Sequence, residues 1–353
     1  MKKIFLAILL ATAGMNWIAA EEPVATIAEN GIQFETLQLE NGKAKVSVEC
    51  QVQSNRPKGI SLQLEVFYDN TRLYFRNRPY KQGEPISFNV NLRNVHAWTP
   101  EYPNLYRAEF SLWLAEEEIG HRTVFFPVRT VEFADKTCLL NGKKLNLHGV
   151  QMQEQEAFMP SNPKDAIRYR LNWLRAIGCN AIGCSSEHHP SLPALCDQLG
   201  FILITPSEPK ADQLLPTFVD EPLEYGYQPT LAYYKYLKQW KKKDAACLVT
   251  SDDPSHLEVL PEYVGDLTYI HIRLLAANNY LCNKAKNAIS IELDGTGELL
   301  GIVSGSEIIK AEGNKMQYKP TDGILTAVVH GNGNLSARSE DIVGALLQIN
   351  HNK

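Results

Sequence analysis

Apolar and polar residues alternate along residues 22–132. The apolar side chains occupy every second position in four stretches, which are 44–52, 60–66, 86–92 and 106–114. A period of two predicts strands that bury one face and expose the other. Turn-forming residues separate these stretches. About seven short strands in such a span predict an antiparallel β-sandwich of the immunoglobulin type over residues 21–132.

The pattern changes over residues 133–257. Asn141-Gly142 stands between two short apolar segments and predicts a tight hairpin, and Asn162 is suited to cap a helix. Strands are expected at 145–150, 179–184, 201–205 and 245–250, and helices at 163–177, 192–199 and 230–243. Such alternation predicts parallel βα units, interrupted by a polar, proline-rich excursion at 206–229.

Residues 258–353 return to short apolar strands. They are expected at 268–276, 288–293, 299–303 and 324–329, with Gly- and Asn-rich turns between them. This arrangement predicts a second, C-terminal immunoglobulin-like sandwich. The expected architecture is therefore one sandwich, a small α/β part and another sandwich.

Aromatic residues crowd the stretch 225–240. Tyr233, Tyr236 and Trp240 recur at helical spacing, which favours a helix face packed against the sheet. The alternative is an exposed aromatic surface that stacks on sugar rings.

The first twenty residues have their own character. Lys2 and Lys3 precede an apolar run, and small residues stand at 19–20. This order predicts a secretory signal peptide at residues 1–20, and therefore a secreted or periplasmic protein. The apolar run is short for a membrane span, so no membrane association is expected after cleavage. An uncleaved anchor is the alternative.

Charge and cysteine content exclude several classes of function. The chain has 35 basic and 40 acidic residues, a balance that gives no reason to expect a nucleic-acid partner. Seven cysteines are too few for a disulfide scaffold of this length. Three of them, Cys179, Cys184 and Cys196, lie near two histidines but form no C-x-x-C pair, so buried thiols are favoured over a metal site. No cofactor motif is present, and no cofactor is expected.

Several motifs follow one another as in a known family. TPEYPNLYRAEFSL (99–112), VRTVEF (128–133) and LNGKKLNLHGV (140–150) resemble glycoside hydrolase family 2, which includes β-galactosidases and β-glucuronidases. NWLRAIGCNAI (172–182) and LCDQLGFILI (195–204) are similar to the second and third strands of the family's catalytic (β/α)8 barrel. ISIELDGTGELLGIVSGS (289–306) resembles an immunoglobulin-like module appended after that barrel.

The departures from this family are also informative. A complete barrel takes about 250 residues, and residues 133–257 provide about half of that, so a truncated half barrel of TIM-barrel type is expected. The family's acid/base glutamate follows an asparagine after the fourth strand, where this chain has Asp252-Asp253-Pro254. The family's nucleophile lies on a seventh strand, which has no counterpart here. Both catalytic glutamates are therefore expected to be missing.

Some polar residues remain at the expected carboxyl ends of the strands. Glu187 with His188, and Asp253, are the candidate catalytic residues, because a carboxylate beside a histidine can move protons. The alternatives are a solvated loop with a helix cap at Glu187 and a simple turn at Asp253. The candidates for carbohydrate binding are Gln153, Glu154, His189 and Trp98.

Two functions are consistent with this sequence. The first is a secreted, family-2-like protein that no longer hydrolyses sugars and binds carbohydrate or protein. The second is an active β-glycosidase with a non-standard carboxylate pair. A half barrel would expose edge strands and an apolar inner face, which predicts self-association or a protein partner. A product without function is the third interpretation.

Overall fold

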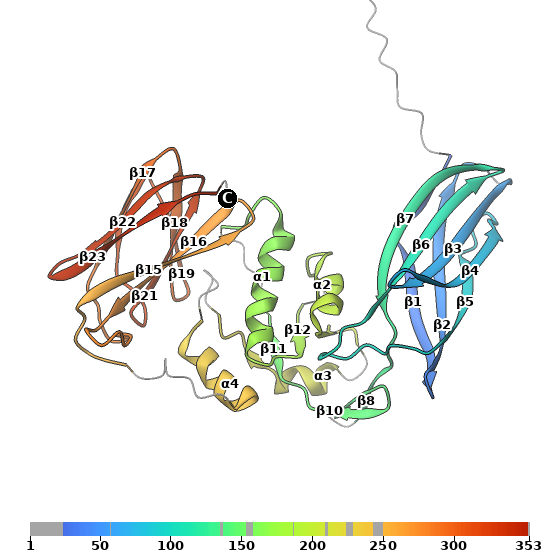
Figure 1. Ribbon diagram of the computed structural model, residues 1–353, viewed down its shortest axis with the longest axis horizontal. Coiled ribbons are helices and arrows are strands. Elements are labelled where there is room, and N and C mark those ends of the chain that lie inside the picture. Colours follow the sequence, from blue (N-terminus) through green and yellow to red (C-terminus); the bar gives the residue numbers. More distant parts are fainter. Residues whose placement is uncertain are drawn as a thin grey trace, which may run out of the picture.

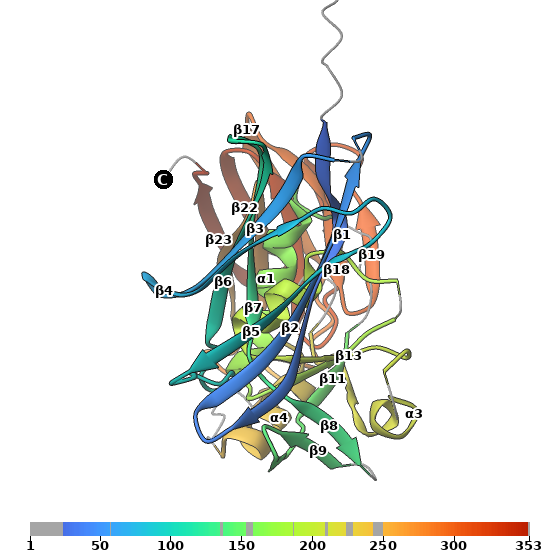
Figure 2. The same cartoon turned by 90° about the vertical axis from the view of Figure 1, so that its right-hand side faces the viewer.

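The computed structural model describes residues 24–56, 58–134, 137–152, 158–185, 187–208, 211–223, 229–242 and 250–351. Two β-sandwiches stand at opposite ends of the molecule, and a smaller part with α-helices lies between them (Figure 1). In the view turned by 90°, the N-terminal sandwich lies in front of the C-terminal one (Figure 2). The order of the parts in space is that of the sequence.

The N-terminal part is the predicted antiparallel sandwich. Its strands are β1 (Ala25–Glu40), β2 (Lys43–Ser54), β3 (Ile60–Tyr68), β4 (Thr71–Pro79), β5 (Ile86–Arg93), β6 (Leu105–Leu114) and β7 (Glu117–Pro127). They form sheets in the orders β1-β2-β5 and β4-β3-β6-β7. Val46, Val48 and Cys50 are fully buried, whereas Lys45 and Glu49 at the alternate positions are exposed, as the period of two predicts.

The predicted hairpin follows the sandwich. β9 (Thr137–Leu140) and β10 (Lys143–Leu145) are joined by Asn141 and Gly142, with φ angles of 51° and 73°. Positive φ at both central residues is the geometry of a type I′ turn, for which Asn-Gly is favoured. β8 (Val131–Ala134) pairs with β9 and completes a three-stranded sheet.

A parallel sheet lies at the centre of the middle part. Its strands are β11 (Gly149–Gln151), β12 (Ala181–Gly183), β13 (Ile202–Ile204) and β14 (Val219–Asp220). The surrounding elements are α1 (Pro163–Ala176), α2 (Leu192–Leu199), α3 (Ala211–Leu214), the 3-10 turn η1 (Leu215–Thr217) and α4 (Leu231–Lys241). The Asn162 side chain accepts a hydrogen bond from the Lys164 amide at 3.3 Å, so the predicted N-cap of α1 is confirmed.

The sheet contains one strand, β14, that the sequence pattern did not predict. The sheet has the order β13-β12-β11-β14, so β14 pairs in parallel with β11 and lies next to the first strand. The excursion at 206–229 is therefore not a plain loop, because it contains α3, η1 and β14. The strand expected at 145–150 is limited to β11. The expected strand at 245–250, apart from Thr250, and the expected signal peptide at 1–20 lie outside the described residues.

One face of the parallel sheet packs against helices. Val150 and Ile182 of the sheet share a buried cluster with Leu171 of α1, Leu195 of α2 and Tyr233 of α4. The aromatic side chains of Tyr236 and Trp240 lie partly buried against the same cluster. The helix-face interpretation of this aromatic stretch is thus confirmed for its described residues. Tyr225 and Tyr227 lie outside them.

The opposite face of the sheet is covered by residues 211–218, which comprise α3, η1 and Phe218. A Cβ atom added at Gly149 would lie 2.2 Å from the Phe218 ring, and one added at Gly183 would lie 2.7 Å from Leu215. Ala181 of the sheet joins the same buried cluster as Phe218. The small residues on the strands therefore make room for this segment. The expectation of an exposed apolar inner face is wrong, because the chain covers that face itself.

A buried ion pair holds the end of this segment. Arg170 of α1 donates two hydrogen bonds to the Glu221 carboxylate, which follows β14 directly. Both side chains are almost completely buried. A buried pair of this kind is costly to break, because either partner alone would leave an uncompensated charge. The pair ties the chain after β14 to the helix that follows β11.

The C-terminal part is the second predicted sandwich. Its strands are β15 (His256–Val264), β16 (Leu267–Leu275), β17 (Ile289–Gly295), β18 (Glu298–Ser304), β19 (Glu307–Lys310), β20 (Lys315–Tyr318), β21 (Ile324–His330), β22 (Gly333–Ser339) and β23 (Ile342–Ile349). The order is β19-β18-β21-β16-β15-β23-β22-β17-β20. A parallel pairing at His256 and Val343 joins β15 to β23. Five of these strands, β15, β19, β20, β22 and β23, were missed by the pattern.

The contact between Gly149 and Phe218 can be tested by a double-mutant cycle. We expect Gly149→Ala to lower the free energy of unfolding by about 2 kcal/mol, because the added methyl group overpacks the Phe218 ring. In a Phe218→Ala background the same change should cost almost nothing, because the ring is gone. Urea denaturation measures both. Gly120→Ala is the matched control, since its Cβ would meet Leu112 at an ordinary 3.5 Å. Equal costs of Gly149→Ala in both backgrounds would contradict the packing.

The buried His271 of β16 predicts a pH dependence of stability. Its Nδ1 lies 3.0 Å from the Thr326 hydroxyl, and within the described residues its Nε2 has no hydrogen-bond partner. Burial, with a smaller effect from Arg273, lowers the pKa of His271 to about 4. The native state therefore keeps the imidazole neutral, while the unfolded chain binds a proton at an ordinary pKa of about 6.5.

The stabilisation from this histidine is complete above about pH 6.5 and is lost as the pH falls from there to 4. The expected loss is about 3 kcal/mol in the free energy of unfolding. The glutamine of His271→Gln stays neutral at every pH. The free energy of unfolding of this variant, measured by urea titration, should therefore lack this loss between pH 7 and pH 4. Identical pH profiles for the two proteins would contradict the burial of an uncharged imidazole.

Candidate functional site

The carboxyl ends of β11 and β12 are the place where a (β/α) barrel builds its active site. Here Gln151 Nε2 donates a hydrogen bond to the Leu215 carbonyl oxygen at 3.0 Å. The Leu215 side chain lies over Gly183, the last residue of β12. Backbone and an aliphatic side chain of the 211–218 segment therefore stand where polar groups would be needed to bind a substrate.

The candidates beside β12 lie in an exposed turn. The Glu187 side chain is exposed, and its carbonyl oxygen accepts a hydrogen bond from the Ser185 hydroxyl at 2.7 Å. His189 Nδ1 accepts from the Ser191 amide at 3.1 Å, just before α2 begins. His188 Nδ1 lies 3.3 Å from the His189 carbonyl oxygen. These contacts are those of a turn that leads into a helix.

Asp253 lies in a different environment. Its amide donates a long hydrogen bond of 3.4 Å to the Ser251 hydroxyl, and its side chain is exposed. The neighbouring Asp252 forms an exposed ion pair of 3.2 Å with Lys284, which precedes β17. Thr250 bridges to Leu281. This segment therefore belongs to the edge of the C-terminal sandwich rather than to the parallel sheet.

The predicted catalytic candidates do not form a cluster. Within the part of the chain that the structure describes, no hydrogen bond or ion pair joins Glu187 or His188 to Asp253. Retaining glycosidases need two carboxyl groups about 5 Å apart. Two of the sugar-binding candidates, Gln153 and Glu154, lie outside the described residues.

Trp98 has a structural role that the sequence did not reveal. Its ring is fully buried, and its Nε1 donates a hydrogen bond to the Asp197 carbonyl oxygen of α2 at 2.8 Å. The Arg129 guanidinium stacks 4.0 Å from the ring centre and pairs with the Asp197 carboxylate at 2.8 Å. Asn141 Nδ2 donates to the Trp98 carbonyl oxygen. The burial of Trp98 is incompatible with sugar stacking and makes it a joint between the sandwich and α2.

The thiols near the two histidines are buried side chains. Burial raises the pKa of Cys179 to about 12 and raises that of Cys196 well above its usual range. Such thiols are neutral at physiological pH and poor metal ligands. Among the described residues, no group of three or more His, Cys, Asp or Glu side chains could hold a metal ion.

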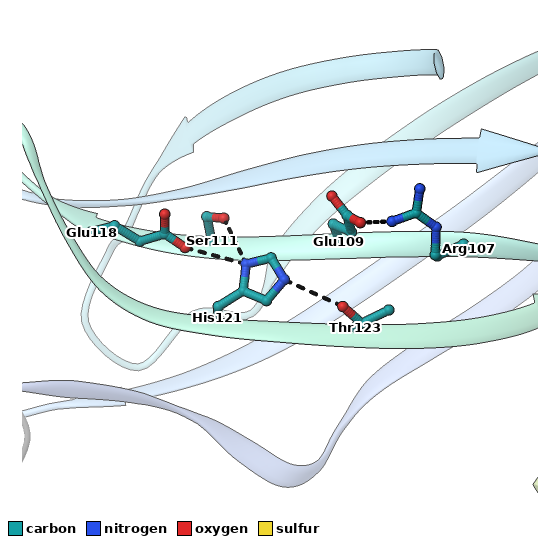
Figure 3. A network of polar contacts seen from close by, with 6 residues as sticks. All are labelled: Arg107, Glu109, Ser111, Glu118, His121 and Thr123. Atoms are coloured by element: carbon teal, nitrogen blue, oxygen red, sulfur yellow. Dashed lines mark hydrogen bonds and ion pairs between the residues drawn. The ribbon is translucent and has the colours of Figure 1, made fainter. Parts of the chain in front are cut away.

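A serine, a histidine and a glutamate do meet on the outer face of β6 and β7 (Figure 3). Ser111 Oγ and Glu118 Oε1 both lie 3.2 Å from His121 Nδ1, and Thr123 lies 3.2 Å from His121 Nε2. In a catalytic triad the serine and the acid contact different nitrogens of the ring. Here they share one nitrogen, so the ring cannot relay a proton between them. The sequence signal was the alternation of polar residues on β7.

The described helices are too short or too polar to span a membrane. None of the side chains discussed above forms a preorganised catalytic pair.

Residues 28–129 match the model of the family "Glycosyl hydrolases family 2". A protein of Formosa agariphila whose name proposes a β-glucuronidase is 24% identical over 245 residues, which are 67% of this chain and 23% of that protein. A β-galactosidase of Pectobacterium atrosepticum is 30% identical over 33% of this chain and 12% of its own length. The chain thus spans less than a quarter of the length of these curated relatives.

Solved structures share the fold over most of the chain. A β-glycosidase from Bacteroides vulgatus has a TM-score of 0.72 at 12% identity, covering 92% of this chain and 79% of its own. A β-glucuronidase from glycoside hydrolase family 2 has a TM-score of 0.68 at 10% identity, covering 90% of this chain and 61% of its own. At 10–12% identity this likeness shows a shared fold.

The joint at Trp98 predicts a stability effect at the boundary of two parts. We expect Arg129→Met to lower the free energy of unfolding by about 2 kcal/mol, because it leaves the partly buried Asp197 carboxylate without its partner. Burial already raises the pKa of Asp197, and Arg129 opposes this rise. Thermal and urea unfolding measure the loss, and adding Asp197→Asn should restore part of it.

Arg72→Met is the matched control for this joint. Arg72 pairs with Glu65 at 2.7 Å, but the Arg72 side chain is 57% exposed. Exposed pairs contribute about 0–1 kcal/mol, so this variant should be almost as stable as the wild type. Equal losses for Arg72→Met and Arg129→Met would show that the Trp98 joint has no special role.

Proposed function

We propose that the chain, which is similar to family 2 glycoside hydrolases over part of its length, is a secreted, non-hydrolytic protein that binds carbohydrate. The single observation that supports this best is the position of residues 211–218. Leu215 lies over Gly183 at the carboxyl end of β12, where a barrel would receive a sugar, and Phe218 fills the inner sheet face at Gly149. The scaffold is retained, while the space for the reaction is filled by the chain itself.

The chemistry of the strand ends supports the same proposal. Hydrolysis with retention needs one carboxyl group as acid/base and a second as nucleophile, facing each other across the bond. The exposed Glu187 and Asp253 side chains lie on segments with separate contacts. Within the described part of the chain, neither carboxylate forms an ion pair or a side-chain hydrogen bond.

Carbohydrate is the favoured ligand for two reasons. The relatives named above carry the names of enzymes that act on glycosides. In addition, both sandwiches present exposed polar groups on an outer sheet face, such as His121 and Thr123 on the first and Ser290 and Gln317 on the second, which can bond to sugar hydroxyl groups. The basic start of residues 1–20 supports export from the cytoplasm.

The loss of hydrolysis can be tested with nitrophenyl β-galactoside and nitrophenyl β-glucuronide. We expect the wild type, Glu187→Gln and Asp253→Asn to release nitrophenol no faster than buffer, because the two candidate carboxylates lie on segments with separate contacts in the described part of the chain. A cooperative thermal transition of each sample serves as the control for folding. If the wild type turns over either substrate and one of the substitutions abolishes that turnover, the proposal is wrong and the protein is an active glycosidase.

Binding requires a separate measurement. On a glycan array the labelled wild-type protein should bind at least one class of sugar, with the heat-unfolded protein as the control. A folded protein that binds no glycan would contradict the carbohydrate-binding part of the proposal.

A further inference from the structure

Three adjoining hollows lie on the outer face of the C-terminal sandwich, over β17, β20 and β22. Their volumes are about 330, 330 and 550 Å³. Ser290, Gln317 and Arg338 line two of them jointly, and Gln317 lines all three. The hollows therefore form one continuous depression, here named the β20 groove. We propose that the β20 groove binds an acidic oligosaccharide, one that carries uronate groups.

Strand register places the polar side chains of the groove in rows. Ser290 pairs with Gln317 on one side and with Arg338 on the other. Neighbouring strands are about 4.8 Å apart, so these three side chains form a row about 10 Å wide. Glu292 is paired in the same way with Lys315 and Ser336, two residues further along. Hydroxyl and amide groups in one plane can both donate to and accept from ring hydroxyl groups.

The alternate residues of these strands explain why the face is rigid. Ile289, Ile291 and Leu293 of β17 point to the other side and are almost completely buried in the sandwich core. Their packing fixes the strand from below. A ligand in the groove would therefore meet side chains that project from a fixed sheet, which reduces the entropy lost on binding.

The charge of the groove selects an anionic ligand. Lys315 is paired with Glu292, and the Tyr318 hydroxyl donates to Glu307. Lys286, Lys319 and Arg338 also line the groove, and within the described residues they form no ion pair; the same holds for two acidic residues, Glu307 and Glu340. The unpaired groups thus leave an excess of positive charge. A carboxylate matches the arginine fork and would be held by two hydrogen bonds.

A second depression shows that this charge excess is specific. A cleft of about 420 Å³ lies between the β1–β2 turn and the β9–β10 hairpin. It is lined by two acidic residues, Glu40 and Glu101, and by two basic ones, Lys143 and Lys144. Its charges balance, so it offers no comparable preference for an anion.

Sugar is favoured over the other anionic polymers. The chain carries a net charge of −5, which opposes non-specific binding of the dense charge of a nucleic acid. The row formed by Ser290, Gln317 and Arg338 offers hydroxyl, amide and guanidinium groups to sugar hydroxyl and carboxylate groups. At one end the partly exposed ring of Tyr318 lines the groove and provides apolar surface for a sugar ring.

This inference rests on the proposed carbohydrate-binding function and can fail separately from it. Isothermal titration calorimetry should compare an oligogalacturonide with a neutral galacto-oligosaccharide of the same length. We expect the wild type to bind the acidic sugar more tightly, and binding to weaken as salt is added. The variant Arg338→Glu with Lys319→Glu should bind the acidic sugar at least about tenfold more weakly, because charged hydrogen bonds are lost.

The matched control is Lys43→Glu with Lys45→Glu on β2. Both lysines are exposed, and the net charge of the chain changes by the same amount. This variant should bind the acidic sugar like the wild type. If the groove variant binds the acidic sugar as tightly as the wild type, the β20 groove is not the binding site, and the proposed function is unaffected. Binding of neutral sugars alone would overturn the acidic specificity. Absence of any glycan binding would overturn both proposals.

Discussion

The contact between Phe218 and Gly149 is the constraint on which the middle of this molecule depends. A side chain at residue 149 would occupy the position of the aromatic ring, so the sheet needs glycine there. With the ring in place, Leu215 reaches Gly183 and β14 extends the sheet beside β11. A parallel sheet of short strands, which alone would expose an apolar face, thereby becomes a closed layer between helices and the 211–218 segment.

The two sandwiches depend on this layer through different contacts. On the N-terminal side, Trp98 inserts between Arg129 and α2, and the pairing of Arg129 with Asp197 joins two parts of the chain. On the C-terminal side, the Ser161 amide before α1 donates to Asp266 at 2.8 Å, and the Tyr269 hydroxyl donates to the Phe158 carbonyl oxygen. Polar contacts with defined direction thus orient both sandwiches on the middle part.

Local signals could be predicted from the sequence, and long-range contacts could not. Asn141-Gly142 and Asn162 act on their own neighbours, so the type I′ turn and the N-cap were readable. Phe218 meets Gly149 across a long stretch of chain, and β14 has too few residues to show a period. Trp98 was predicted to bind sugar because the contact with α2 that buries its ring joins residues far apart in the sequence. For the candidate site, Glu187 and Asp253 could be named, but not the separate contacts of their segments.

The central claim is that residues 211–218 cover the inner face of the sheet in solution. Hydrogen exchange monitored by mass spectrometry tests it most directly, because an amide buried in this layer opens only with the surrounding structure. The Phe218 amide donates to the Leu215 carbonyl oxygen, and the β14 backbone pairs with β11. We predict that peptides covering 214–220 exchange as slowly as those covering β12. Exchange as fast as in the exposed turn at 81–84 would mean that the inner face is open and would contradict the account.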